Sequence, residues 1–126
     1  MKVHNPPNVA PGTGYSHGIE LAPNERILYI AGQLGVSPDG KMGDGIQAQA
    51  EQAWKNIGNI LAAAGMGYQN LVKVNHYITR KEDLAAYREV RARFLGTNTP
   101  ASTLLVISAL AREGAVVEVE AVAAKA

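Results

Sequence analysis

Two glutamates on one predicted strand are the first candidates for chemistry in this sequence. Glu118 and Glu120 alternate with small apolar residues over residues 116–123, so an extended strand places the acids on one face and the apolar residues on the other. A carboxylate is costly to bury unless it is paired or hydrogen-bonded. The acids therefore indicate a functional site or an interfacial ion pair, with a solvated strand edge as the alternative.

Other reactive residue types are few. The chain has no cysteine, which excludes a disulfide scaffold, a thiol nucleophile and a cysteine-ligated metal. His4, His17 and His76 match no metal-ligand spacing, so we expect no metal site. His76 falls on the apolar face of a strand and is interpreted as a packed, hydrogen-bonded residue. Ser102 has no obvious His or Asp partner in the sequence, and is interpreted as a hydrogen-bond donor to a ligand or as a space-filling residue.

Composition and charge favour a small globular protein. The 126 residues include 12 basic and 11 acidic side chains, for a net charge of +1. This balance lacks the basic patches of a nucleic-acid binder, which argues against nucleic acid as a partner. The sequence carries no signal-peptide pattern and no apolar stretch long enough to span a membrane. We expect a single cytoplasmic domain over residues 1–126 with no membrane partner.

The first half of the chain predicts two strands and a long helix. Strands are expected over residues 15–21 and 26–36, joined by turn residues 22–25 into a hairpin. Asp44 is a plausible N-cap for an amphipathic helix that runs to about residue 64. Gly65 then occupies the position of a left-handed C-cap.

The second half predicts a strand, a helix and two more strands. Thr79 and Glu82 match a capping box before an apolar stripe at helical spacing, and Gly96 ends that helix. The predicted elements cover residues 71–78, 84–94, 103–107 and 116–123. The element order is therefore ββαβαββ, an α+β fold with two helices on one face of a mixed sheet.

Two of these strands have no polar face. Residues 27–31 and 104–107 are apolar without a break, whereas a sheet covered on one face alternates apolar and polar residues. With only two helices available, we expect the second face to be covered by another subunit. The alternative is that the outward apolar side chains are half-exposed.

Several short motifs together resemble one family. They are Gly14-Tyr15-Ser16-His17, Ala31-Gly32-Gln33, Ala63-Ala64-Gly65, Pro100-Ala101-Ser102-Thr103 and Val117-Glu118-Val119-Glu120-Ala121. In this order they resemble the RidA family, also called YjgF/YER057c/UK114 and historically endoribonuclease L-PSP. The resemblance implies a chorismate-mutase-like fold and a homotrimeric barrel with clefts between subunits. It also implies hydrolysis of imines and enamines such as 2-aminoacrylate without a cofactor.

The resemblance also implies a set of site residues. Glu118 matches the family glutamate that places the attacking water, and Tyr15 matches a tyrosine that contacts substrate. Ala31 and Gly32 match the Ser-Gly step of the site, with the serine lost. Ser102 stands where the family has the arginine that forks onto the substrate carboxylate.

Arg88 aligns with a family asparagine on the second helix. Its guanidinium could replace the missing one, or it could remain solvated beside the nearby arginines of that helix.

Three functions follow from the sequence. The first is a hydrolase for a small imine, enamine or related C–N compound, with specificity altered from 2-aminoacrylate by the lost arginine. The second is a non-catalytic trimer that binds a small metabolite in the same clefts. The third is an endoribonuclease or translation inhibitor, against which the balanced charge argues.

Overall fold

The computed structural model describes residues 1–126 as six strands and two α-helices. Short 3₁₀ turns, η1 (Tyr68–Asn70) and η2 (Lys81–Asp83), precede β4 and α2. The elements in chain order are β1 (Lys2–His4), β2 (Gly18–Glu20), β3 (Arg26–Leu34), α1 (Gly45–Ala63), β4 (Leu71–Ile78), α2 (Leu84–Leu95), β5 (Ala101–Val106) and β6 (Val117–Lys125).

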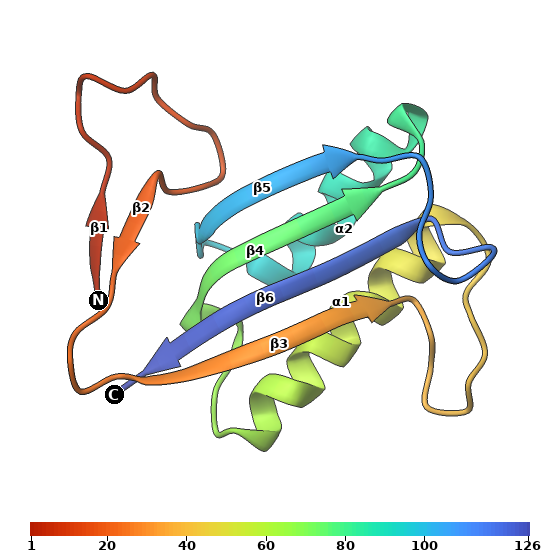
Figure 1. Cartoon of the computed structure of the whole chain (residues 1–126), viewed down its shortest axis with the longest axis horizontal. Coiled ribbons are helices and arrows are strands. Elements are labelled where there is room, and N and C mark those ends of the chain that lie inside the picture. Colours follow the sequence, from red (N-terminus) through yellow and green to blue (C-terminus); the bar gives the residue numbers. More distant parts are fainter.

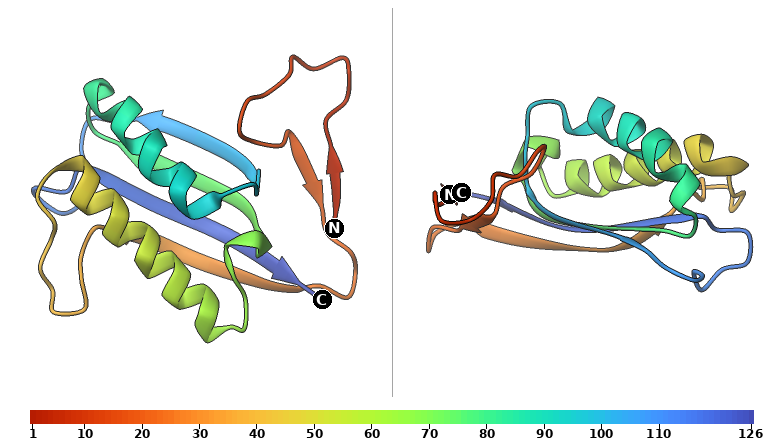
Figure 2. Two further views of the ribbon diagram at one scale, coloured as in Figure 1. Left: turned by 180° about the vertical axis from the view of Figure 1, so that it is seen from behind. Right: turned by 90° about the horizontal axis from the view of Figure 1, so that it is seen from above.

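Four strands form the main sheet in the order β3-β6-β4-β5. The strand β6 pairs antiparallel with both β3 and β4, whereas β4 and β5 are parallel neighbours. Both helices lie on one face of this sheet, as Figure 1 and the edge-on view in Figure 2 show. Two helices on one face of a mixed sheet confirm the predicted α+β class. The crossover through α2 is what allows β4 and β5 to run parallel.

The core lies between the helices and the sheet. It is a cluster of 17 buried residues. The predicted apolar face of β6 supplies Val117, Val119, Ala121 and Ala123 to it. Trp54 of α1 and Tyr87 of α2 are fully buried members of this core.

Both α-helices begin and end near their predicted positions. Asp44 is the N-cap of α1, although its side chain makes no capping hydrogen bond. Gly65 and Gly96 follow the two helices with φ of 71° and 58°, a left-handed backbone that glycine adopts without strain. The Thr79–Glu82 capping box is wrong: the chain passes through η2, and Arg80 pairs with Asp83 instead. No helix is both long and apolar enough to cross a membrane.

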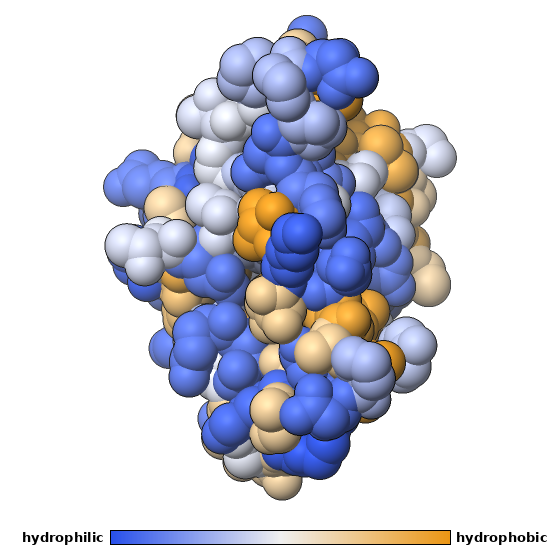
Figure 3. Space-filling model, turned by 90° about the vertical axis from the view of Figure 1, so that its left-hand side faces the viewer, coloured by the Kyte–Doolittle hydropathy of each residue, from blue (hydrophilic) through white to orange (hydrophobic).

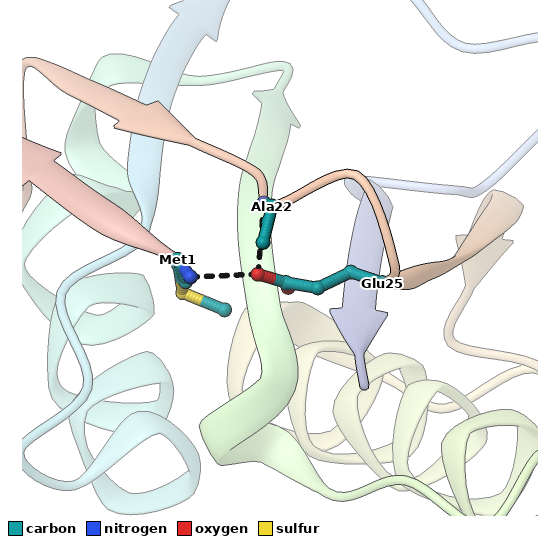
Figure 4. Close-up of polar contacts among 3 residues, drawn as sticks. All are labelled: Met1, Ala22 and Glu25. Carbon is teal, nitrogen blue, oxygen red and sulfur yellow. Dashed lines mark hydrogen bonds and ion pairs between the residues drawn. The ribbon is translucent and has the colours of Figure 1, made fainter.

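The predicted N-terminal hairpin is also wrong. The β2 strand has only three residues and pairs with β1, while β3 pairs with β6 at the other end of the sequence. The turn after β2 is fixed by Glu25, whose carboxylate accepts hydrogen bonds from the Met1 ammonium at 2.6 Å and from Ala22 N–H at 3.0 Å (Figure 4). This turn leads the chain out of the small sheet, and β3 gains a longer ladder with β6 than β2 could offer.

The sheet face opposite the helices, called the open face below, is uncovered in the single chain. Large apolar side chains are exposed on this face of β3 and β5: Ile27, Tyr29 and Leu105, with Tyr29 77% exposed. In Figure 3 orange, apolar side chains gather along the right-hand margin, which is the edge-on profile of this face. An uncovered apolar sheet face of this kind is typical of a subunit interface.

Candidate functional site

Three of the residues predicted for the site share one hollow. This hollow, called the arginine hollow below, has a volume of about 370 Å³ and lies beside the edge strand β5. Its lining combines the N-terminal loop, α2 and β5: Thr13, Tyr15, Arg88, Arg91, Ser102 and Leu104. The sequence predicted Tyr15, Arg88 and Ser102, but it did not single out Arg91.

Tyr15 is held at the hollow by its neighbour Ser16. Ser16 forms an isolated parallel bridge with Ala101 of β5, and its N–H donates to the Pro100 carbonyl at 3.3 Å. The Ser16 hydroxyl donates to the Thr99 carbonyl. Residues 15–17 therefore run along the β5 edge as an irregular segment, not as the start of the predicted strand. The Tyr15 ring also packs edge-on against His17, with 5.4 Å between ring centroids.

The two arginines of the hollow have no acidic partner. The salt bridges of this chain occupy Arg80 and Arg93 but neither Arg88 nor Arg91. Burial lowers the pKa of the Arg91 guanidinium, and the nearby positive charge of Arg88 lowers it further. No aspartate or glutamate lines the hollow, so its field is positive and favours an anion.

Ser102 has a buried histidine partner, contrary to the sequence interpretation. His76 Nε2 lies 2.8 Å from Ser102 Oγ, and His76 Nδ1 contacts the Tyr87 hydroxyl. His76 is fully buried, which confirms it as a packed, hydrogen-bonded residue. Burial lowers the pKa of His76 to about 3, with the positive charges of Arg91 and Lys73 adding to the shift. The imidazole is therefore neutral near pH 7.

Glu118 lies away from this hollow, on the open face of the sheet. A Cβ added to Gly32 would sit 2.5 Å from Glu118 Oε2, so the absence of a side chain at Gly32 gives the carboxylate its position. Ala31 and Gly32 fall in a register shift of the β3–β6 ladder between Ile30 and Gln33. Such a bulge frees backbone groups from the ladder, and they border the Glu118 carboxylate.

The neighbouring acid, Glu120, is engaged within the chain. Its carboxylate accepts hydrogen bonds from the Tyr77 hydroxyl at 2.6 Å and from Asn75 Nδ2 at 3.0 Å. These bonds, the Tyr77 bond first, lower the pKa of Glu120. Glu118 makes no hydrogen bond of this kind, so its carboxylate is not engaged by another side chain of this chain.

The predicted site residues therefore form two groups. Tyr15, Arg88 and Ser102 line the hollow on the helix side of the sheet, whereas Ala31, Gly32 and Glu118 lie together on the open face. The sequence missed Arg91 and the Ser102–His76 bond. The spacing of Arg88 and Arg91 puts them on one helix face, which was a usable signal, but the β4–β5 register that brings His76 to Ser102 was not readable. No three His, Asp or Glu side chains gather as metal ligands.

Comparison with protein families gives one match over nearly the whole chain. Residues 6–125 match the family model described as endoribonuclease L-PSP. Protein HMF1 of Saccharomyces cerevisiae is 32% identical over 117 residues, covering 92% of this chain and 88% of that protein. The human 2-iminobutanoate/2-iminopropanoate deaminase is 35% identical over 101 residues, covering 79% of this chain and 73% of the enzyme.

Solved structures with the same fold agree. A protein of unknown function of the conserved Rid family, YyfB from Yersinia pestis, superposes with a TM-score of 0.85 at 29% identity, covering 97% of this chain and 96% of that chain. RidA from an Antarctic Psychrobacter superposes with a TM-score of 0.74 at 36% identity, covering 91% and 90%.

Proposed function

Because the chain belongs to the Rid family, also named YjgF/YER057c/UK114 and endoribonuclease L-PSP, we propose that it hydrolyses a small imine or enamine acid to the keto acid and ammonia. The proposal extends the activity in the name of its 2-iminobutanoate deaminase relatives to this chain. It includes a changed specificity, since Ser102 replaces the arginine that the family resemblance leads us to expect.

The observation that carries the proposal is the convergence of Tyr15, Arg88 and Ser102 in the arginine hollow. A guanidinium can fork onto a carboxylate and fix its orientation. Arg88 reaches the hollow from α2, so it can supply the charge that position 102 no longer carries. Tyr15 and Ser102 add hydroxyl groups that orient the bound acid.

Glu118 is the residue that positions the attacking water and takes a proton from it. In the reaction, water oxygen bonds to the C=N carbon while Glu118 accepts one water proton and the nitrogen is protonated. The hydroxyl of this adduct then gives up its proton as the C=O bond forms, the C–N bond breaks and ammonia leaves with both water protons. The backbone groups at the Ala31–Gly32 bulge help to place the water. Glu118 and the arginine hollow lie on different faces of one sheet, so one chain does not bring them together.

We therefore infer that the working site forms between copies of this chain, in a homotrimer. The exposed apolar side chains of the open face, such as Tyr29 and Leu105, support an assembly in which they are covered. In that assembly the Glu118 of one copy would approach the arginine hollow of the next.

The test is hydrolysis of imines made in situ by an amino-acid oxidase, with semicarbazide present to trap imine that escapes. A hydrolase lowers the semicarbazone yield and raises keto-acid release above a no-protein control. No acceleration across several side-chain classes would leave a non-catalytic binding trimer as the better description.

Glu118→Gln keeps the size of the side chain and removes its basicity. We expect kcat to fall about 100-fold or more, the usual contribution of a general base, with little change in ligand binding. Glu120→Gln is the matched control, because that carboxylate is already bound to Tyr77 and Asn75. Equal losses in the two variants would contradict the assignment of Glu118.

A further inference from the structure

We propose that the arginine hollow selects a ligand with two negative groups, a 2-imino dicarboxylic acid, held by Arg88, Arg91 and a Ser102 hydroxyl that His76 and Tyr87 fix as a donor. That the ligand is an imino acid rests on the proposed function. The preference for two negative charges rests on the residues that line the hollow.

The first step concerns charge. Arg88 and Arg91 line the same hollow, and no salt bridge engages either of them. Like charges that face each other repel, and the lowered pKa of Arg91 reflects both its burial and the charge of Arg88. A ligand with one carboxylate pairs with one guanidinium and leaves the other uncompensated. A ligand with two carboxylates neutralises both.

The second step concerns the direction of the hydrogen bonds behind Ser102. Tyr87 is fully buried, and its hydroxyl contacts His76 Nδ1. The Trp54 indole lies near this hydroxyl, but it can only donate and offers no acceptor for the Tyr87 hydrogen. The Tyr87 hydrogen therefore goes to His76 Nδ1, because the opposite arrangement would leave a buried hydroxyl donor unsatisfied.

The third step follows from the tautomer. A neutral imidazole that accepts at Nδ1 carries its hydrogen on Nε2, so His76 donates to Ser102 Oγ across 2.8 Å. The Ser102 hydrogen is then free to point into the hollow. Ser102 is thereby a donor to an anion and not a nucleophile, since a histidine that donates to it cannot take its proton. His76 and Tyr87 are positioning residues.

The size of the hollow fits such a ligand. About 370 Å³ lies at the lower end of the range for small-molecule sites, about 300–1,000 Å³. A five-carbon diacid fills part of this space and leaves its C=N carbon accessible to a water from a second copy.

Binding of stable keto acids tests the charge preference without catalysis. The full chain is titrated calorimetrically with 2-oxoglutarate and 2-oxobutanoate, the keto acids of a dicarboxylic and a monocarboxylic imine. We expect 2-oxoglutarate to bind about tenfold more tightly, as one additional charge-assisted pair provides. Equal affinities would overturn the proposal, and a preference for inorganic phosphate over 2-oxoglutarate would overturn the assignment to a dicarboxylate.

Arg91→Gln should abolish the preference while the weaker binding of 2-oxobutanoate remains. The matched control is Arg93→Gln, which removes the same charge from the same helix but at a residue that pairs with Glu51 outside the hollow. A preference that survives Arg91→Gln, or that Arg93→Gln removes equally, contradicts the role of Arg91.

The tautomer has its own readout. Long-range ¹H–¹⁵N spectra of the imidazole should show His76 protonated at Nε2 alone, and Tyr87→Phe should shift it toward a mixture and weaken 2-oxoglutarate binding. A His76 protonated at Nδ1 would overturn the donor role of Ser102. If no imine hydrolysis is detected but the preference for the dicarboxylate holds, the proposed function is wrong and this inference stands. If imine hydrolysis is detected but 2-oxoglutarate and 2-oxobutanoate bind equally well, the proposed function stands and this inference is wrong.

Discussion

His76 illustrates how burial, aided by the nearby charges of Arg91 and Lys73, sets the charge of a side chain. The residue contacts the Tyr87 hydroxyl and Ser102, and it stacks at a tilt near Trp54 with 6.0 Å between ring centroids. Nothing acidic is among these contacts. Loss of hydration therefore disfavours the imidazolium form, and the pKa falls from 6.5 to about 3.

This shift makes folding stability depend on pH. The unfolded chain binds a proton at His76 below pH 6.5, while the native chain does so only near pH 3. The stability is fully present above the unfolded pKa and is lost as pH falls toward the folded pKa, by up to about 1.4 kcal/mol per pH unit.

His76→Gln removes this titration, so the unfolding free energy of the variant should fall less steeply with decreasing pH in that interval. Urea denaturation at a series of pH values measures how the unfolding free energy of each protein changes with pH. Subtracting one slope from the other removes the contribution of the carboxylates, which both proteins share. Parallel slopes would show that His76 does not titrate as inferred.

At the scale of elements, the contact between the end of β3 and α1 fixes how the helix layer lies on the sheet. Gly35 follows β3 and has room for no side chain, since an added Cβ would lie 2.3 Å from the Gln49 Cα. Gln49 in turn donates to the carbonyls of Gly43 and Gly114 and accepts from Val116 N–H. One buried amide thus joins α1 to the two loops at its N-terminal end.

Gly35→Ala should destabilise the fold by about 1–3 kcal/mol, the usual cost of forcing atoms into a packed contact. The matched control is Gly18→Ala in β2, where an added Cβ meets its nearest neighbour at an ordinary 3.7 Å. Urea-induced unfolding of both variants measures the difference. If the Gly35→Ala and Gly18→Ala proteins are equally stable, α1 can shift away from residue 35 without loss of stability, and the close contact does not fix the helix.

At the scale of the whole molecule, the two groups of site residues have different surroundings. The arginine hollow is complete in one chain, whereas Glu118 faces outward on a sheet face that has no cover. The same face exposes Tyr29 beside Ala31, Lys73 and Glu120. Assembly would bury this face and bring the two groups together.

Tyr29→Glu places a charge on that face near Glu120 and should prevent assembly. We expect a trimer for the natural chain and a smaller species for the variant, as measured by sedimentation equilibrium. Ala62→Glu, at an exposed position of α1, makes the same charge change on the helix layer and should leave the trimer intact. A natural chain that sediments as a monomer, or a Tyr29→Glu trimer, would contradict the assembly.

Much of the fold was readable from periodicity. The helical stripe after Asp44, the alternation of β6, and glycines at both helix ends are local patterns, and each appears in the structure within a few residues. The predicted N-terminal hairpin was wrong because strand pairing depends on which segments lie side by side in the fold. The strand β2 pairs with β1, and β3 pairs with β6. The capping box failed because Arg80 and Asp83 formed a competing local contact.

For the site, the sequence by itself determined the residue types: a strand with Glu118 on its non-core face, a serine where an arginine was expected, and a second helix rich in arginine. Only the tertiary structure decided which of them meet. In the folded chain, Arg88 and Arg91 line one hollow together with Tyr15 and Ser102. Ser102 is hydrogen-bonded to His76, a partner that no residue near it in the sequence could provide. The physical reason is strand register: β4 and β5 are separated by a whole helix in the chain, and only their alignment in the sheet brings His76 to Ser102.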